Sequence, residues 1–493
     1  MKGELTLNTE SNRMTKSVNV GGVLLAVAAS TFLATFNETF LNVALNPIMA
    51  SMAVSAGTVQ WLTTAYMLAA AIMVPVTGFL YQKVPTRRLF LVALGLLLAG
   101  TLMGAAAPVF GVLVAARVVQ ALGTGMIVPI GMNLVLAISA PEKLGANMGI
   151  VTAMTTLGPA FGPIAAGAVL AAFDWPALFV AFAVLVVACI AVAAVFVGNV
   201  AELTNPRMDA PSVCLVSLGL VGLLYGLSTV FSGQLAVAGA ALAVGIACMA
   251  AFIVRQRRLD HPFLDLRPFG VRSFRLGAGV VLAALMTVFS MNIVLPLFMQ
   301  GSLGFTPLQA ALTLLPACLV SCVLAPIAGK AYDRWGISVI VPVGMGVITC
   351  FVLALSFCDS AATSLLIVAL YAPAIAGCAF TMGPAQSHAL ASLDRSLYPH
   401  GVTIMSTLFQ IAGCVGSSLF VGVLSMVQAS AMANGAAEAA AVASGFDVAC
   451  LVAFAVDVCG FVLALMAARA ARRSRTAAAQ QVVVKRANAL QDC

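Results

Sequence analysis

The sequence predicts an all-α polytopic membrane protein with fourteen transmembrane helices. Of the 493 residues, 62% are hydrophobic and only 8% are charged, whereas soluble proteins carry about 25% charged residues. Fourteen apolar runs are long enough to cross a bilayer as helices. Lys and Arg gather in alternate loops, as they do on the cytoplasmic side of membranes. These three observations exclude a soluble globular fold.

Glycine, proline, asparagine or charged residues separate each apolar run from the next. The runs fall into three groups along the chain. The first group is predicted at 20–45, 59–80, 89–107, 110–138, 146–173 and 177–197. The second covers 212–231 and 235–254, and the third covers 276–299, 308–331, 338–357, 364–388, 402–427 and 448–468. The first run follows a basic segment but is too long for a signal peptide, so we expect it to be an uncleaved span.

The charged residues predict the orientation of the chain. Lys and Arg follow every even-numbered run and occur at both ends of the chain, whereas the loops after odd-numbered runs lack them. The charged residues of those other loops are Asp174, Asp359, Glu438 and Asp447. We therefore expect a multi-pass protein of the plasma membrane with both termini cytoplasmic. Topology accounts for the net charge of +8 without nucleic acid.

Two segments of similar sequence follow the second and the tenth run. The first begins Gly-Phe-Leu-Tyr-Gln-Lys at Gly78, and the second begins Gly-Lys-Ala-Tyr-Asp-Arg at Gly329. If the seventh and eighth runs are an insertion, these segments occupy equivalent places in two six-helix halves. The predicted divisions are an N-terminal segment (1–19), a first half (20–198), two inserted helices (199–254), a basic linker (255–275), a second half (276–468) and a basic tail (469–493).

The fifth run combines glycine and proline in an unusual way. Gly158 and Gly162 are four residues apart, as are Pro159 and Pro163, and Gly167 follows. The glycines let a neighbouring helix approach closely, while each proline removes a backbone donor and bends the helix. Tight packing of a helix pair would explain the glycines alone. The paired prolines favour a bent helix between two moving halves.

Polar residues recur at helical spacing in the first run. Thr31, Thr35, Glu38 and Asn42 form one stripe, and Asn37 lies beside it. A carboxylate inside hydrocarbon is costly and normally faces a cavity or a partner, so Glu38 is a candidate for proton exchange. The alternative is a hydrated, inert glutamate near the outer headgroups, because Glu38 lies in the outer half of the run.

Two further charges stand well inside predicted spans. Arg117 lies in the fourth run and shares a helix face with Gln120, and Asp457 lies midway along the last run. Charges at this depth face the bundle interior and have partners, so both residues are candidates for proton coupling. Arg117 could instead bond the carbonyls of a neighbouring helix. Asp457 could line a cavity of the second half or pair with another helix.

Uncharged polar residues and methionines within the runs are candidates for an adaptable, largely apolar substrate site. The candidates are Asn37, Asn42, Gln120, Met154, Asn292, Gln386 and Gln410. The default interpretation of the methionines is packing. The sequence contains no metal-ligand cluster, no nucleotide-binding loop and no nucleophile with a base. We therefore expect no enzyme activity, no metal and no cofactor.

Four motifs in order, the internal repeat and the number of runs resemble the fourteen-span drug:proton antiporter family of the major facilitator superfamily. That family includes exporters for quaternary-ammonium and lincomycin resistance. The fifth run resembles its antiporter signature. Arg117 stands in a segment similar to the fourth-helix motif, in which the arginine is linked to proton transfer.

The first-helix motif and the gating loops of that family also have counterparts in this chain. Asn37 stands where much of the family has an aspartate, and the acid follows at Glu38. In the first gating loop, the usual aspartate, arginine and glycine are replaced by Gln82, Lys83 and Pro85. The gating residues that the resemblance implies are Gly78, Arg87, Arg88, Gly329, Asp333 and Arg334.

The residues alone predict a two-half, ATP-independent transporter with a buried acid and a buried base. The resemblance implies the major facilitator fold and a proton-coupled exporter, a drug:H⁺ antiporter of amphiphilic cationic or neutral drugs that works by alternating access. Its expected partners are a small amphiphilic substrate, protons and membrane lipid, and we expect a monomer. The alternatives are a dedicated exporter of a native metabolite or lipid, a proton symporter and a non-transporting membrane sensor.

Overall fold

The computed structural model describes residues 19–59, 61–200, 203, 209–230, 234–259, 262–359 and 361–491, and the regular elements in this part of the chain are all helices. Fourteen helices among these residues are long and apolar enough to cross a membrane. The predicted fold class and number of spans are therefore confirmed. The predicted N-terminal segment lies outside the described residues except for Asn19, which accepts a hydrogen bond from the Gly22 N–H at 3.0 Å and caps the first helix.

The helices fall into three sets along the chain. The first set is α2 (Val20–Thr39), η1 (Phe40–Ala44), α3 (Leu45–Ser51), α4 (Ala56–Val59), α5 (Trp61–Lys83), α6 (Thr86–Ala105), α7 (Phe110–Ile138), α8 (Leu144–Leu170) and α9 (Pro176–Phe196). The second set is α10 (Ala210–Thr229) and α11 (Leu235–Arg258). The third set is α12 (Arg272–Gly301), α13 (Pro307–Trp335), α14 (Ile337–Leu355), α15 (Ser364–Ala391), α16 (Tyr398–Ala433) and α17 (Glu438–Gln491).

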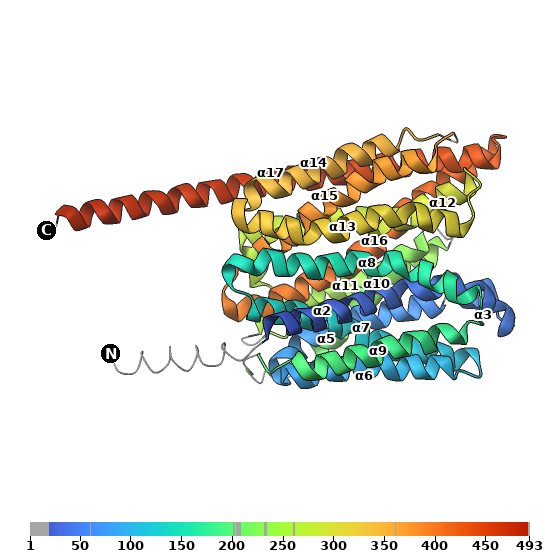
Figure 1. Ribbon diagram of the computed structural model, residues 1–493, viewed down its shortest axis with the longest axis horizontal. Helices are drawn as coiled ribbons and strands as arrows, with labels where there is room; N and C mark the ends of the chain where they lie inside the picture. Colours follow the sequence, from blue (N-terminus) through green and yellow to red (C-terminus); the bar gives the residue numbers. More distant parts are fainter. Residues whose placement is uncertain are drawn as a thin grey trace.

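Two hydrophobic cores organise these helices into two bundles. One core joins buried residues mainly from α2, η1 and α5–α9, and the other joins residues of α12–α17. Figure 1 shows the helices of both bundles running along the long axis of the molecule. The bundles meet where α8 of the first lies beside α13 of the second. The helices α10 and α11 pack together, and α10 contacts both α5 and α16. The boundaries given above for the halves stay predictions.

Small residues let the helix backbones approach one another. A Cβ atom added at Gly149 of α8 would lie 2.5 Å from the Ala325 carbonyl oxygen of α13. A Cβ atom added at Gly222 of α10 would lie 2.7 Å from the Cα atom of Gly245 in α11. Larger side chains at these glycines would force the helix pairs apart.

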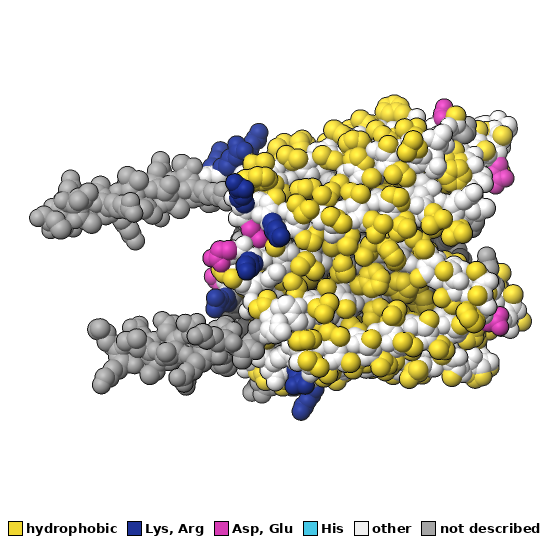
Figure 2. All heavy atoms as spheres, viewed as in Figure 1, with side chains coloured by type: hydrophobic (Ala, Val, Ile, Leu, Met, Phe, Trp, Pro, Cys, Tyr) yellow, Lys and Arg dark blue, Asp and Glu magenta, His cyan; other side chains and the backbone are white. Residues whose placement is uncertain are grey.

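Charged and apolar residues separate along the bundles. The start of α2 and the end of α17 lie at the same end of the molecule (Figure 1). Lys and Arg side chains gather at that end, while hydrophobic side chains cover most of the face beyond it (Figure 2). We call it the basic end, and the residues that define it are Lys83, Arg87, Arg88, Lys143 and Arg334. A bilayer-spanning protein requires this separation.

The first and last spans compare differently with their predicted ranges. The first candidate span covers Val20–Ala44 and agrees with the predicted run over 20–45 to within one residue, although α2 gives way to the tighter helix η1 at Phe40. The last run is predicted over 448–468, but α17 begins at Glu438 and continues past Ala468. Its extra residues are rich in alanine, which has the highest helix propensity. Helix propensity therefore extends α17 beyond the apolar segment that hydropathy detects.

Candidate functional site

Arg117 of α7 lies among oxygen acceptors inside the first bundle. It is only 1% exposed. Nη1 donates to Gln120 Oε1 at 2.8 Å and to Asn37 Oδ1 at 3.1 Å, and Nη2 donates to the Asn37 carbonyl at 3.2 Å. Nε donates to the Leu62 carbonyl at 3.4 Å. Arg117 thus joins α7 to α2 and α5, and it bonds backbone carbonyls as one sequence interpretation expects.

Tyr66 of α5 extends this network. Its ring centroid lies 4.1 Å from the Cζ atom of the arginine, which is a favourable cation–π distance. Asn37 Nδ2 donates to Tyr66 Oη at 3.2 Å, and Tyr66 Oη donates to Thr124 Oγ1 at 2.8 Å. Gln120 Nε2 donates to Thr101 Oγ1 of α6 at 2.9 Å. Four helices of one bundle therefore meet around a single cation.

Glu38 follows Asn37 at the end of α2 and is half-buried. Its carboxylate interacts with the side chain of Gln410 on α16 of the other bundle, and the charge of Arg117 acts on it. The fold thus brings together two candidate residues from opposite ends of the sequence. Glu38 therefore lies where the two bundles meet.

A small pocket also lies between the bundles. Its lining includes Thr156 and Pro159 of α8, Phe289 and Asn292 of α12, Met382 of α15 and Phe409 of α16. None of the lining residues is charged, and aromatic, aliphatic, hydroxyl and amide groups are combined. Such a lining suits an amphiphilic ligand. The predicted substrate residue Asn292 also accepts a hydrogen bond from Tyr371 Oη at 3.5 Å.

The other six predicted substrate residues lie outside the lining of that pocket, and Asn37, Gln120 and Gln410 belong to the contacts of Arg117 and Glu38 described above. Asn42 is exposed in η1. Gln386 of α15 is buried and donates to the Met132 sulfur of α7 at 3.7 Å. Met154 of α8 packs in a small apolar cluster with Ala325 of α13. Gln386 and Met154 thus contribute to contacts between the bundles.

Gly158 and Gly162 of α8 face α2 within the first bundle. A Cβ atom at Gly158 would lie 2.7 Å from the backbone nitrogen of Phe36 and collide with Thr35. At Gly162 it would lie 3.0 Å from the Phe40 nitrogen. The glycine spacing predicts a closely packed neighbour for this helix without identifying it, and the structure shows that the neighbour is α2.

The prolines of α8 have a matching partner on α2. Pro163 has no N–H, so the Pro159 carbonyl lacks its usual helical donor. Thr39 Oγ1 donates to that carbonyl at 3.1 Å. A Cβ atom at Gly167 would meet open space, so this glycine is not part of the close packing.

At the basic end, α13 closes onto the first turn of α8. Asp333 Oδ1 accepts from the Gly145 N–H at 2.9 Å, and Oδ2 accepts from the Ala146 N–H at 3.1 Å. The first N–H groups of a helix lack partners within it, and the helix dipole favours an anion there. A Cβ atom at Gly329 would collide with the Gly145 carbonyl. The second predicted gating loop therefore binds across the two bundles.

The first predicted gating loop uses the same plan with a different polar residue. Gly78 of α5 packs against α16, because a Cβ atom there would collide with the Thr403 side chain. Gln82 occupies the position equivalent to Asp333, and its Nε2 donates to the Gly78 carbonyl at 3.1 Å. Both repeats thus place a glycine against the opposite bundle, while an amide replaces the carboxylate in the first.

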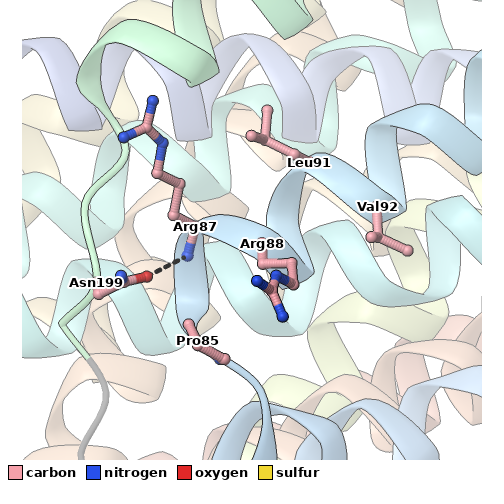
Figure 3. Close-up of a pocket in the computed structure, with 6 residues that line it drawn as sticks. All are labelled: Pro85, Arg87, Arg88, Leu91, Val92 and Asn199. Carbon is pink, nitrogen blue, oxygen red and sulfur yellow. Dashed lines mark hydrogen bonds between the residues drawn. The ribbon is translucent and has the colours of Figure 1, made fainter.

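Arg87 connects α6 to the end of α9. Its Nη2 donates to the Ala194 carbonyl at 2.6 Å. Its backbone N–H donates to Asn199 Oδ1 at 3.1 Å (Figure 3). A cation near a helix C-terminus satisfies a free carbonyl and complements the helix dipole. Arg88 lines a second pocket, together with Arg87 and Asn199. Arg334 is exposed. These bonds of Arg87 stay within the first bundle.

Asp457 of α17 is fully buried in the second bundle. Its Oδ1 accepts a hydrogen bond from Thr287 Oγ1 of α12 at 2.8 Å. Its Oδ2 has no hydrogen-bond partner among the described residues. The ion pairs within the described part of the chain are Asp209–Arg255 and Asp265–Arg267.

Sequence reasoning missed three residues that contact the charged groups. They are Tyr66, which contacts Arg117, Thr287, which contacts Asp457, and Gly145, which contacts Asp333. Their residue types are common in apolar helices, so only the folded structure shows that they contact a charged group. One signal was available for Thr287, because it lies midway along its run at the depth of the acid. No group of His, Cys, Asp and Glu that could hold a metal ion occurs among the described residues.

Comparison with known proteins gives a consistent result. The family described as Major Facilitator Superfamily matches residues 27–421. The lincomycin resistance protein LmrB of Bacillus subtilis is 33% identical over 82% of this chain and 86% of its own length. The riboflavin transporter RibZ of Clostridioides difficile is 25% identical over 81% of this chain and 87% of its own. The human organic anion transporter MFSD10 shares the fold, with a TM-score of 0.61 over 89% of this chain and 99% of that chain at 13% identity.

Proposed function

This chain belongs to the Major Facilitator Superfamily, and we propose that it is a proton-coupled exporter of amphiphilic cationic or neutral drugs. A relative named for lincomycin resistance aligns over most of both chains, which supports drug export. One contact carries the proposal of proton coupling. Glu38 of one bundle faces Gln410 of the other, within the field of the buried Arg117.

The charge of this carboxylate links proton binding to movement of the bundles. When Glu38 is ionised, the guanidinium and the Gln410 amide both favour its charge, and hydrogen bonds to a charged group are about twice as strong as neutral ones. Protonation from outside weakens this contact and releases substrate outward, and deprotonation inward resets the site. A proton driven by about 100 mV supplies roughly 2.3 kcal/mol, enough for about fiftyfold accumulation of a neutral substrate.

We place the basic end in the cytoplasm, because Lys and Arg concentrate on that side of membrane proteins. Both termini are then cytoplasmic in the plasma membrane, with lipid around a monomer. In this orientation the contact of Asp333 with the first turn of α8 closes the cytoplasmic end. The pocket at Asn292 would receive substrate from the cytoplasm only after α8 and α13 separate.

Transport of ethidium, a fluorescent cation, into proteoliposomes tests the proposal. Uptake should require an acidic interior and should stop when an uncoupler collapses the gradient. Glu38→Gln should weaken the response to the gradient, whereas Glu142→Gln, at an exposed glutamate of the basic end, should behave as wild type. An unchanged response to the gradient in Glu38→Gln would remove this residue from the mechanism. If uptake by the wild type did not depend on the pH gradient, proton coupling would be refuted.

A dedicated exporter of a native metabolite is the second candidate. The alignment with a riboflavin transporter over 81% of this chain favours it. The same vesicles distinguish the two functions. Gradient-driven movement of riboflavin, with no movement of several fluorescent cations by folded protein, would support the metabolite exporter over the drug exporter.

A further inference from the structure

We propose that Asp457 is a second proton-binding site, distinct from Glu38, and that it holds a proton in this conformation. The inference rests on the proposed function, because it adds a second proton to the same transport cycle. It assigns one proton site to each bundle. The exchange then moves at least two protons for each substrate.

The surroundings of Asp457 do not compensate a negative charge. The side chain is 0% exposed, and Thr287 supplies a single hydrogen bond at 2.8 Å. The second oxygen has no partner among the described residues. An isolated carboxylate in an apolar interior is so unfavourable that the group becomes neutral instead. The carboxyl therefore keeps its proton while α12 and α17 stay packed.

The groups that face Asp457 from neighbouring helices are neutral. Helix α12 presents the Thr287 hydroxyl, and the Cys378 thiol of α15 is the titratable group that interacts with the acid. Helices α12, α14 and α16 pack against α17. The cations of α12 and the histidine of α16 stand in the first turns of those helices, at the basic end. Arg275, for example, lies about 18 Å along α12 from Thr287.

The position of Thr287 connects Asp457 to the pocket between the bundles. Thr287 immediately precedes Val288, which lines that pocket. Cys378 stands one turn before Met382 of α15, another lining residue. When the bundles separate and α12 shifts, Thr287 moves with the pocket wall. The hydrogen bond to Asp457 then breaks, water reaches the carboxyl group and the proton can leave.

The number of protons moved per ethidium tests this proposal. Proteoliposomes that contain a pH indicator report proton flux, and ethidium fluorescence reports substrate flux in the same vesicles. Asp457→Asn should move one proton fewer than wild type, and its maximal accumulation at about 100 mV should fall about fiftyfold. Glu438→Gln changes an exposed acid of the same helix and should match wild type. Equal ratios in wild type and Asp457→Asn would overturn the proposal.

Infrared spectroscopy of the purified protein keeps the test decisive if Asp457→Asn folds but does not transport. Wild type and Glu438→Gln should show a protonated-carboxyl band that Asp457→Asn lacks, and an unchanged band in Asp457→Asn would overturn the proposal. The two proposals fail in different ways. A wild type that moves ethidium without protons refutes antiport itself, whereas a wild type that moves one proton refutes only the second site.

Discussion

Replacing Asp333 by alanine should loosen the closed basic end. The change removes two hydrogen bonds to the first turn of α8, from Gly145 and Ala146, together with a negative charge. Loss of a capping acceptor costs about 0.5–2 kcal/mol, and loss of the charge–dipole interaction costs about 0.3–1 kcal/mol. The sum of about 1–3 kcal/mol corresponds to a shift of about 5- to 150-fold toward the open form. Asp333→Asn keeps one acceptor and should give about a two- to fivefold shift.

The native thiol of Cys322 on α13 can report this opening. It packs in the apolar cluster that includes Ala153 and Met154 of α8, so it lies at the closed interface. The rate of labelling by a water-soluble maleimide, followed by mass spectrometry of its peptide, should rise with the open population. The expected order of rates is Asp333→Ala, then Asp333→Asn, then wild type. Arg334→Gln, at the exposed neighbour, is the control. A wild-type rate in Asp333→Ala would refute the capping argument.

Three other changes test the first bundle and the inserted helices. Arg117→Lys should lower transport at least about tenfold with normal membrane insertion, because an ammonium group cannot copy the planar fork; wild-type ethidium transport would contradict this. Thr39→Val leaves the Pro159 carbonyl without a donor and should lower the free energy of unfolding by about 1–3 kcal/mol. Thermal unfolding measures this change against Thr39→Ser, and an equal midpoint in both variants would count against it. The hydrogen bond from Arg255 lowers the pKa of Asp209 to about 2 from the ordinary 3.8. The stability that this ion pair adds to the fold is therefore complete above pH 3.8 and is lost as the pH falls through 2. Protection from hydrogen exchange at the start of α10, taken relative to the intrinsic rate at each pH, should fall over that interval in wild type, and an equal fall in Asp209→Asn would refute this assignment.

The charged residues inside the membrane show what the local sequence pattern can and cannot predict. Arg117 and Asp457 stand out in the sequence because charges in apolar runs are rare and costly. Their positions predict that each has a partner, but the partners differ in kind. Arg117 has amide and carbonyl acceptors and an aromatic ring, whereas Asp457 has one hydroxyl. The sequence around a hydroxyl or an aromatic ring in an apolar helix does not indicate which neighbouring helix that side chain will contact.

The fifth span makes the same point for packing. The spacing of Gly158, Pro159, Gly162 and Pro163 predicts a helix with a smooth face and missing donors. The fold adds that α2 fills that face and that Thr39 supplies a donor to the carbonyl of Pro159. The interface with the other bundle lies on a different set of small residues, which includes Gly145 and Gly149.

The sequence by itself determined that this protein crosses the membrane fourteen times and that most of its Lys and Arg residues gather at one end. Hydropathy and charge act on each segment separately, so a window along the chain measures them. Tertiary structure alone decided that Glu38 faces Gln410, that Asp333 caps α8, and that Asp457 has a single partner. These contacts depend on how each helix is rotated about its axis and on which helices become neighbours. Packing of the whole chain sets both, and no single segment carries that information.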